Sequence, residues 1–134
     1  MAAHLRGRGI EPALVLCSSA VRARETFDLV RPALGDPQVL FEDSVYDASA
    51  DTLLGRLRSV PESVASVLLL GHNPGVQDLT LRLAAAGPRR DDVAAKFPTC
   101  ALATLAVPNA EWHDLGAEES ELIDFVAPKR LAQT

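Results

Sequence analysis

Short runs of apolar residues alternate along the chain with segments whose apolar positions recur every three or four residues. The runs predict strands at residues 13–17, 64–70, 101–107 and 122–126, with a further short strand at residues 39–41. The first two runs are nearly continuous and are bounded by polar residues, proline or glycine. Such runs are typical of strands that are buried on both faces of a parallel sheet.

The periodic segments predict helices over residues 20–34, 50–60 and 76–86, ended by glycine and proline where those residues follow. The apolar face expected for the first helix consists of Val21, Phe27, Val30 and Leu34. Because strands and helices alternate, the pattern favours an α/β fold: three α/β/α layers around a mostly parallel sheet.

The two ends of the chain differ from this pattern. Residues 1–9 resemble the second half of a helix that ends at a glycine, and so short a helix without an N-cap is not expected to be stable alone. We therefore expect the chain to begin inside an element, so that residues 1–134 form a single, N-terminally truncated domain. Residues 129–134 predict a loose tail.

Composition and charge exclude several classes of protein. Apolar residues make up 48% of the chain and the net charge is −5, with the cations scattered, which argues against a nucleic-acid-binding surface. No apolar stretch approaches the length of a membrane span and no leader is visible, so we expect no membrane partner and a cytoplasmic location. Cys17 and Cys100, both in apolar runs, predict buried free thiols in a reducing compartment.

Candidate chemistry begins directly after the strand at 13–17. Ser18 or Ser19 could cap the following helix, and Arg22 falls in its first turn, where a guanidinium can hold phosphate with two hydrogen bonds. Ligands bind at this edge of open α/β sheets, and helix N-termini attract anions. Taken alone, however, such a segment is more often a capped surface helix with solvated arginines.

A second segment, Gly71 to Gly75, follows the strand at 64–70. Asn73 is the expected N-cap and Pro74 the first helical residue. His72 is then placed at the same sheet edge as Arg22, whereas His4 and His113 have no such setting. The convergence of a guanidinium and an imidazole predicts a small anion pocket.

A third segment is acidic. Glu42 and Asp43 follow the short strand at 39–41, with Tyr46 close by. A carboxylic acid near the pocket could protonate a leaving group if burial raised its pKa. A solvated acidic loop is the alternative for either residue taken singly.

Other site chemistries find little support. A cysteine-based phosphatase needs an arginine six positions after its cysteine, and counting from Cys17 places Ala23 there. Three separated histidines and two isolated cysteines form no recognisable metal site, so no metal is expected. Phosphate-binding and dinucleotide-binding glycine motifs are lacking, so no cofactor is expected either.

Taken in order, four segments resemble the histidine phosphatase superfamily, which is phosphoglycerate mutase-like, and within it the small SixA-type phosphohistidine phosphatases. These segments are residues 15–26, 42–48, 69–74 and 96–99. The resemblance implies that Arg22 holds the phosphoryl group, that His72 stabilises charge in the transition state, and that Asp43, or less favourably Glu42, donates a proton. We expect Ser18 and Asn73 to contribute to the same substrate pocket.

The family's first strand ends in Arg-His, and that histidine is the nucleophile. No Arg-His pair occurs in this sequence, so we expect the strand and its motif to lie upstream of Met1. The function implied for the full-length form is a hydrolase acting through a phosphohistidine intermediate on a phosphorylated small molecule or a phosphohistidine protein. The alternatives are an inactive phosphate-binding or interaction module, and a fragment without chemistry that self-associates through an open sheet edge.

Overall fold

The computed structural model describes residues 1–108 and 111–127, so the tail predicted at 129–134 lies outside the described residues. The α-helices are α1 (Ala2–Gly7), α2 (Val21–Val30), α3 (Ala50–Arg58), α4 (Gly75–Leu83) and α5 (Pro88–Ala95). The strands are β1 (Leu14–Ser18), β2 (Gln38–Glu42), β3 (Val67–Leu70), β4 (Leu102–Ala106) and β5 (Glu121–Val126). Short 3-10 helices occupy Arg31–Ala33, Asp43–Val45 and Trp112–Asp114.

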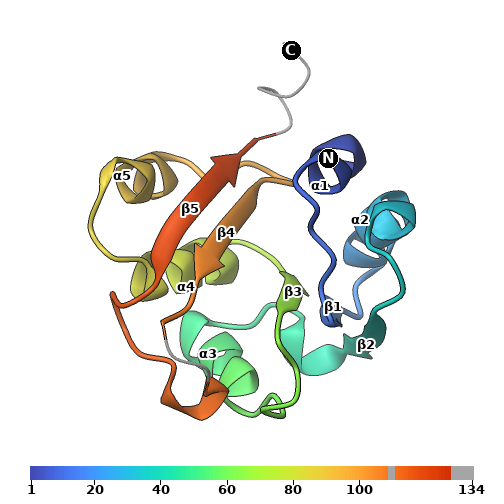
Figure 1. Cartoon of the computed structure of the whole chain (residues 1–134), viewed down its shortest axis with the longest axis horizontal. Helices are drawn as coiled ribbons and strands as arrows, with labels where there is room; N and C mark the ends of the chain where they lie inside the picture. The colour runs from blue at the N-terminus through green and yellow to red at the C-terminus, as the bar shows by residue number, and fades with distance from the viewer. Residues whose placement is uncertain (109–110, 128–134) are drawn as a thin grey trace.

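The strands form two separate sheets (Figure 1). One is parallel, with the order β2-β1-β3, and the other is the antiparallel pair β4-β5, whose register shifts between Thr104 and Leu105. The predicted α/β class with a mostly parallel sheet is therefore confirmed.

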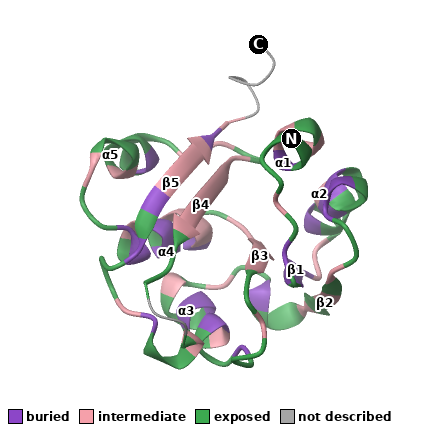
Figure 2. Ribbon diagram, in the orientation of Figure 1, coloured by how far each residue is buried: buried purple, intermediate pink, exposed green. Residues whose placement is uncertain are grey.

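Strand β1 is the centre of the fold because all five of its residues are buried. Leu14 and Leu16 belong to an apolar cluster with residues of α3 and α4, whereas Val15 and Cys17 belong to a second cluster with α1 and α2. Successive side chains of a strand point to opposite faces, so helices cover both sides of the sheet. Figure 2 shows the matching pattern of buried and exposed stripes on α2 and α3.

Helix α2 is shorter than predicted, and a 3-10 turn at Arg31–Ala33 follows it. Pro32 accounts for the change, because proline lacks the N–H that an α-helix interior requires. Phe27 and Leu34 are fully buried as expected. The placement of Val21 on the buried face was wrong: its side chain is 69% exposed, and Ala23 is the buried residue of the first turn of α2.

The sequence pattern does not predict helix α5, because Gly87 and Pro88 also suit the end of the preceding helix. Pro88 instead occupies the first turn of α5, where its missing N–H costs nothing, and Gly87 is the N-cap. Val93 anchors α5 through a fully buried side chain. Helix α4 ends at Leu83, earlier than predicted, because Ala84 forms a β-bridge with Ser120.

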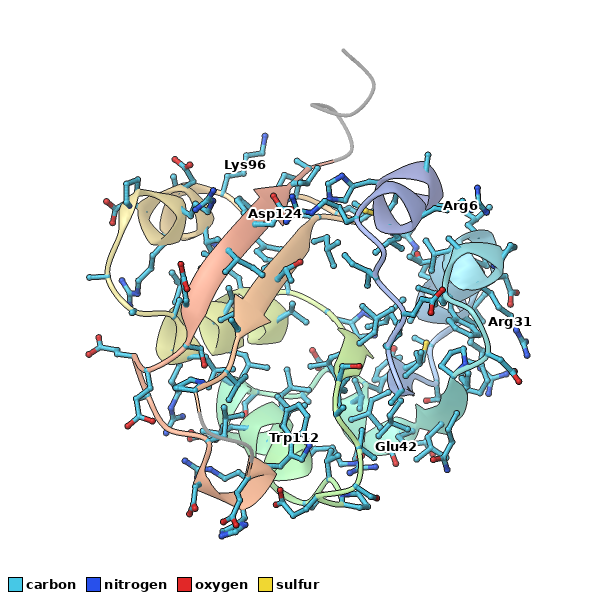
Figure 3. The ribbon with its side chains drawn as sticks, viewed as in Figure 1. Arg6, Arg31, Glu42, Lys96, Trp112 and Asp124 are labelled. Carbon is cyan, nitrogen blue, oxygen red and sulfur yellow. The ribbon has the colours of Figure 1, made fainter. Side chains whose placement is uncertain are left out.

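Helix α1 is held by contacts with distant parts of the chain. Leu5, 2% exposed, packs into the cluster on the α2 side of β1. His4 Nε2 lies 3.0 Å from Asp124 Oδ2 on β5, near the end of the strand (Figure 3). Tertiary contacts thus stabilise a helix that is too short to be stable alone. No helix among the described residues is long and apolar enough to cross a membrane.

Strand β3 differs from its prediction in burial. Its composition suits a strand that is covered on both faces, yet all four of its residues are only half-buried. β3 pairs with β1 alone, and within residues 1–108 and 111–127 no strand lies between β3 and β4. The space between them is a cavity of about 910 Å³ with a largely apolar lining, called the β3–β4 groove below, to which α4 also contributes. Its lining includes Val67, Leu69, Leu79, Leu83, Ala103 and Leu105.

Replacing Gly75 by alanine should destabilise the fold. A Cβ at this buried position would overlap the carbonyl oxygen of Ala48, whose backbone leads into α3. Overpacking of this kind costs about 1–3 kcal/mol, and denaturant unfolding should show the loss. Gly55→Ala is the matched control: Gly55 lies inside α3 with nothing within 4 Å of an added Cβ, so that variant should gain about 0.5–1 kcal/mol. Equal stability of the two variants would contradict the packing described here.

Candidate functional site

A hollow of about 770 Å³ opens at the carboxyl ends of β1 and β3 and is called the strand-end hollow below. It lies at the sheet edge where ligands bind in open α/β folds. It is lined by Ser19, Ala20, Val21, Arg22, Tyr46, Asp47, His72 and Asn73. The structure thus brings together three of the predicted site residues, namely Arg22, His72 and Asn73.

Arg22 stands in the first turn of α2, and its exposed side chain contributes to the wall of the hollow. Within the described part of the chain, no carboxylate lies within ion-pair distance of it. The nearby Arg24, by contrast, packs over the Phe41 ring at 4.4 Å from its centroid. Arg22 therefore offers a free guanidinium beside the positive end of a helix, which suits an oxyanion.

Ser18 is the last residue of β1 and is fully buried. Its Oγ accepts a hydrogen bond from the Ala20 N–H at 3.1 Å and lies 2.7 Å from His72 Nε2. The prediction that Ser18 or Ser19 caps α2 was wrong: Ala20 is the N-cap and no side chain bonds to the free amides. Ser18 lies behind His72, outside the lining of the hollow, and its predicted contact with a substrate stays a prediction.

His72 follows β3, is half-buried and lines the hollow together with Tyr46. The two ring centroids are 5.5 Å apart and the planes are inclined by 57°. Tyr46 was noted in the sequence only as a neighbour of the acidic pair, although its side chain contributes directly to the hollow. An aromatic ring packed beside an imidazole limits how that imidazole can turn.

The acidic residues are arranged differently from the prediction. Asp43 is exposed and is not among the residues that line the hollow. Glu42 is held by Arg56 through hydrogen bonds of 2.6 and 3.0 Å, which raise the pKa of Arg56. The acidic residue that lines the hollow is Asp47, whose φ is +50°. Aspartate tolerates this left-handed conformation better than most residues, which is the local signal that could have pointed to it.

Asn73 is not the N-cap of α4, so that prediction was wrong. The helix begins at Gly75 with Pro74 as its N-cap, and the His72 carbonyl oxygen accepts the Val76 N–H at 3.0 Å. The Asn73 side chain is used elsewhere, since its Nδ2 donates to the Phe97 carbonyl oxygen at 2.6 Å. This bond ties the rim of the hollow to the segment that follows α5.

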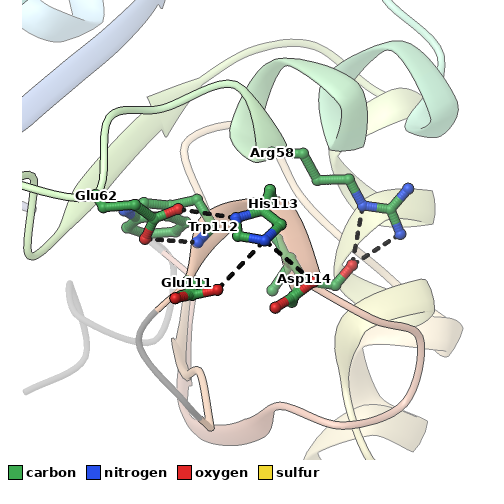
Figure 4. A network of polar contacts seen from close by, with 7 residues as sticks. Arg58, Glu62, Glu111, Trp112, His113 and Asp114 are labelled. Atoms are coloured by element: carbon green, nitrogen blue, oxygen red, sulfur yellow. Dashed lines mark hydrogen bonds and ion pairs between the residues drawn. The ribbon is translucent and has the colours of Figure 1, made fainter.

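A separate polar cluster surrounds His113 on the surface (Figure 4). Its ring nitrogens lie 3.2–3.4 Å from carboxylate oxygens of Glu62, Glu111 and Asp114. The hydrogen bond to Glu62, followed by the charge of Asp114, raises the pKa of His113. These contacts join His113 and its three acidic neighbours in one polar network on the surface. It contributes no residue to the strand-end hollow.

The two cysteines have different environments. Cys17 is fully buried in β1, and desolvation raises its pKa to about 11, an effect that the charge of Arg24 only partly opposes. Cys100 is exposed, so the prediction that both thiols are buried was wrong for this residue. Cys100 has a φ of +62° and lies in a turn before β4 begins. The apolar run that starts near this residue is therefore not packed into the core at Cys100. A nucleophilic thiolate at Cys17 is disfavoured by its burial.

The fold and the hollow together define a three-layer α/β protein with a cationic, imidazole-containing site at the carboxyl edge of its parallel sheet. No family model matches the chain. An uncharacterized protein of Mycobacterium leprae is 33% identical over 118 residues, which are 86% of this chain and 71% of that protein.

Solved structures that are similar to this chain show its class. A protein assigned as the phosphohistidine phosphatase SixA of Agrobacterium tumefaciens is 30% identical with a TM-score of 0.75, over 95% of this chain and 75% of that one. A protein with the same assignment from Nakamurella multipartitia is 28% identical with a TM-score of 0.79, over 95% and 77%. The chain belongs to the SixA-type phosphohistidine phosphatases of the histidine phosphatase superfamily. A further structure at 24% identity and a TM-score of 0.75, a protein histidine phosphatase SixA complexed with tungstate, shares the fold.

Thiol labelling should separate the two cysteines. At pH 8 a thiol whose pKa is about 11 is ionised in only about one molecule in a thousand, whereas an ordinary exposed thiol is ionised about a hundredfold more often. Iodoacetamide should therefore modify Cys100 rapidly and leave Cys17 unmodified in the folded protein, as mass spectrometry of the peptides would show. In denaturant both should react, which serves as the control. Comparable labelling of Cys17 in the folded protein would reopen the cysteine-nucleophile hypothesis.

Proposed function

We propose that this chain forms the phosphoryl-binding part of a phosphohistidine phosphatase. The observation that carries the proposal is the convergence of Arg22 and His72, from two different strand ends, on the strand-end hollow. A guanidinium, a helix N-terminus and an imidazole together provide hydrogen-bond donors on several sides of one tetrahedral anion.

The comparisons support this substrate class. The relatives from Agrobacterium and Nakamurella are assigned as phosphohistidine phosphatases, and the more distant SixA binds tungstate, an oxyanion with the shape of phosphate. For this chain the proposed substrate is a phosphohistidine side chain of a protein, with a phosphorylated small molecule as the alternative. The open hollow, with Tyr46 exposed at its rim, leaves room for a protein surface to approach.

Each of these residues of the hollow would have a different role in the reaction. Arg22 binds two phosphoryl oxygens, and His72 donates a hydrogen bond to a third oxygen as charge develops there. The departing group needs a proton, and the family resemblance implies Asp43 as its donor. Asp47 is the better candidate of the two, because it is among the residues that line the hollow and Asp43 is not.

The nucleophile is the remaining requirement. A phosphohistidine intermediate needs a second imidazole, whose lone pair attacks phosphorus while the bond to the leaving nitrogen breaks; water then releases phosphate from the enzyme. We propose that this imidazole stands at the end of an apolar strand in the β3–β4 groove. A strand running parallel to β3 would bring its carboxyl end to the edge where the hollow lies.

A catalytically inactive binding module is the second candidate. The residues that line the hollow favour it, because they can bind an oxyanion without any nucleophile. The two candidates agree on what Arg22 and His72 bind and differ only in turnover.

Oxyanion binding should depend on Arg22. Calorimetry with tungstate or inorganic phosphate should show one site, and Arg22→Ala should weaken binding about tenfold or more, since a hydrogen-bonded charge pair is worth about 1.5–3 kcal/mol. Arg24→Ala is the matched control, because Arg24 lies on the same helix with its side chain over Phe41. That variant should bind as the parent does. An absence of binding by the parent chain would remove both candidate functions.

Turnover should depend on an added strand. Fusing an apolar strand that ends in Arg-His-Gly ahead of residue 1 should produce hydrolysis of a phosphohistidine protein, measured as phosphate release. The same fusion with alanine in place of its histidine should bind tungstate without turnover. If the first fusion folds, binds tungstate and still releases no phosphate, the binding-module alternative is supported over the phosphatase.

A further inference from the structure

The Ser18 hydroxyl is a fully buried polar group placed between a backbone amide and the imidazole of His72. The Ser18 Oγ accepts a hydrogen bond from the Ala20 N–H at 3.1 Å and lies 2.7 Å from His72 Nε2. Within the described ranges, these two groups are its only hydrogen-bond partners. Because buried polar groups are rarely left unpaired, the donors and acceptors at this position can be counted.

A serine hydroxyl has one hydrogen to donate and two lone pairs to accept with. The Ala20 N–H occupies one lone pair. If His72 Nε2 carried a hydrogen, that hydrogen would occupy the second lone pair, and the hydroxyl hydrogen would remain buried without an acceptor. If Nε2 carries a lone pair instead, the hydroxyl donates to it and every group is satisfied.

We propose that Ser18 is a positioning residue that holds neutral His72 in the tautomer with its hydrogen on Nδ1. The Ser18 O–H donates to Nε2, and Nδ1–H is the ring donor left for a ligand in the strand-end hollow. An oxyanion accepts from an N–H and is repelled by a nitrogen lone pair, so the tautomer decides whether His72 attracts or opposes it. This consequence for a ligand rests on the proposed function, whereas the tautomer does not.

The backbone explains why the two side chains meet. In the register of β1 with β3, Cys17 lies opposite Leu70, so the residues that leave the two strands, Ser18 and His72, remain neighbours. Side chains alternate along β1, and Ser18 therefore points to the same face as Leu14 and Leu16, beneath the imidazole. The Tyr46 ring packs beside His72 and limits its rotation.

Nitrogen-15 spectra of histidine-labelled protein at pH 8 test the proposal, because a ring nitrogen without hydrogen resonates far from one that carries it. In the parent chain His72 should show Nε2 without hydrogen. Ser18→Ala should move the population toward the Nε2–H form, which free histidine prefers, and Ser18→Thr should restore the parent spectrum. Ser66→Ala is the matched control: its Oγ also accepts a backbone N–H beside β1, at 3.1 Å from Ala13 N, but contacts no imidazole.

A parent spectrum with hydrogen on Nε2 would overturn the proposal without reference to any variant, as would an unchanged spectrum in a folded Ser18→Ala protein. Tungstate affinity is the second measurement, with a loss of about tenfold expected in Ser18→Ala and recovery in Ser18→Thr. If the tautomer shifts as expected but the parent binds no tungstate, the role of Ser18 stands and the proposed function fails.

Discussion

The structure depends on the burial of β1 between two layers of helices. All five residues of this strand are buried, and alternate side chains enter two different apolar clusters, so β1 fixes where α2 stands on one face and α4 on the other. Strands β2 and β3 pair with its two edges in parallel. Since the carboxyl ends of parallel strands meet at one edge, burying β1 also gathers the three following loops there. The strand-end hollow is therefore a consequence of how the core is packed.

Signals that arise within a few neighbouring residues predicted most of the fold. The apolar runs located β1 and β3, and their order placed Arg22 and His72 at one edge. The errors occurred where distant contacts decide the outcome. Asn73 bonds to Phe97, 24 residues away, and so does not cap α4, while Pro88 starts a helix whose anchor is the packing of Val93 against β5. Asp47 reaches the hollow through a loop conformation that no periodicity reveals.

The β3–β4 groove is a place where the apolar surface of two strands is incompletely buried. Burying 100 Å² of apolar surface contributes about 2.5 kcal/mol, and the half-buried side chains of β3 and β4 leave such surface incompletely covered. Two strand edges that face one groove also present backbone donors and acceptors to it. An extended apolar segment satisfies both requirements at once, because only a strand can pair with edges on its two sides while its side chains contact the helices above and below.

Binding and chemistry are thus separable in this fold. Arg22 is positioned by α2, His72 by Ser18 and Tyr46, and Asp47 by the loop whose Ala48 packs against Gly75. None of the residues in these contacts lines the β3–β4 groove, so these contacts do not depend directly on a segment placed there. A nucleophile arriving on a strand would meet donors that are already oriented. The free energy gained by burying a strand in the groove would then serve to position the nucleophile. The site for the phosphoryl group would not have to form in the same step.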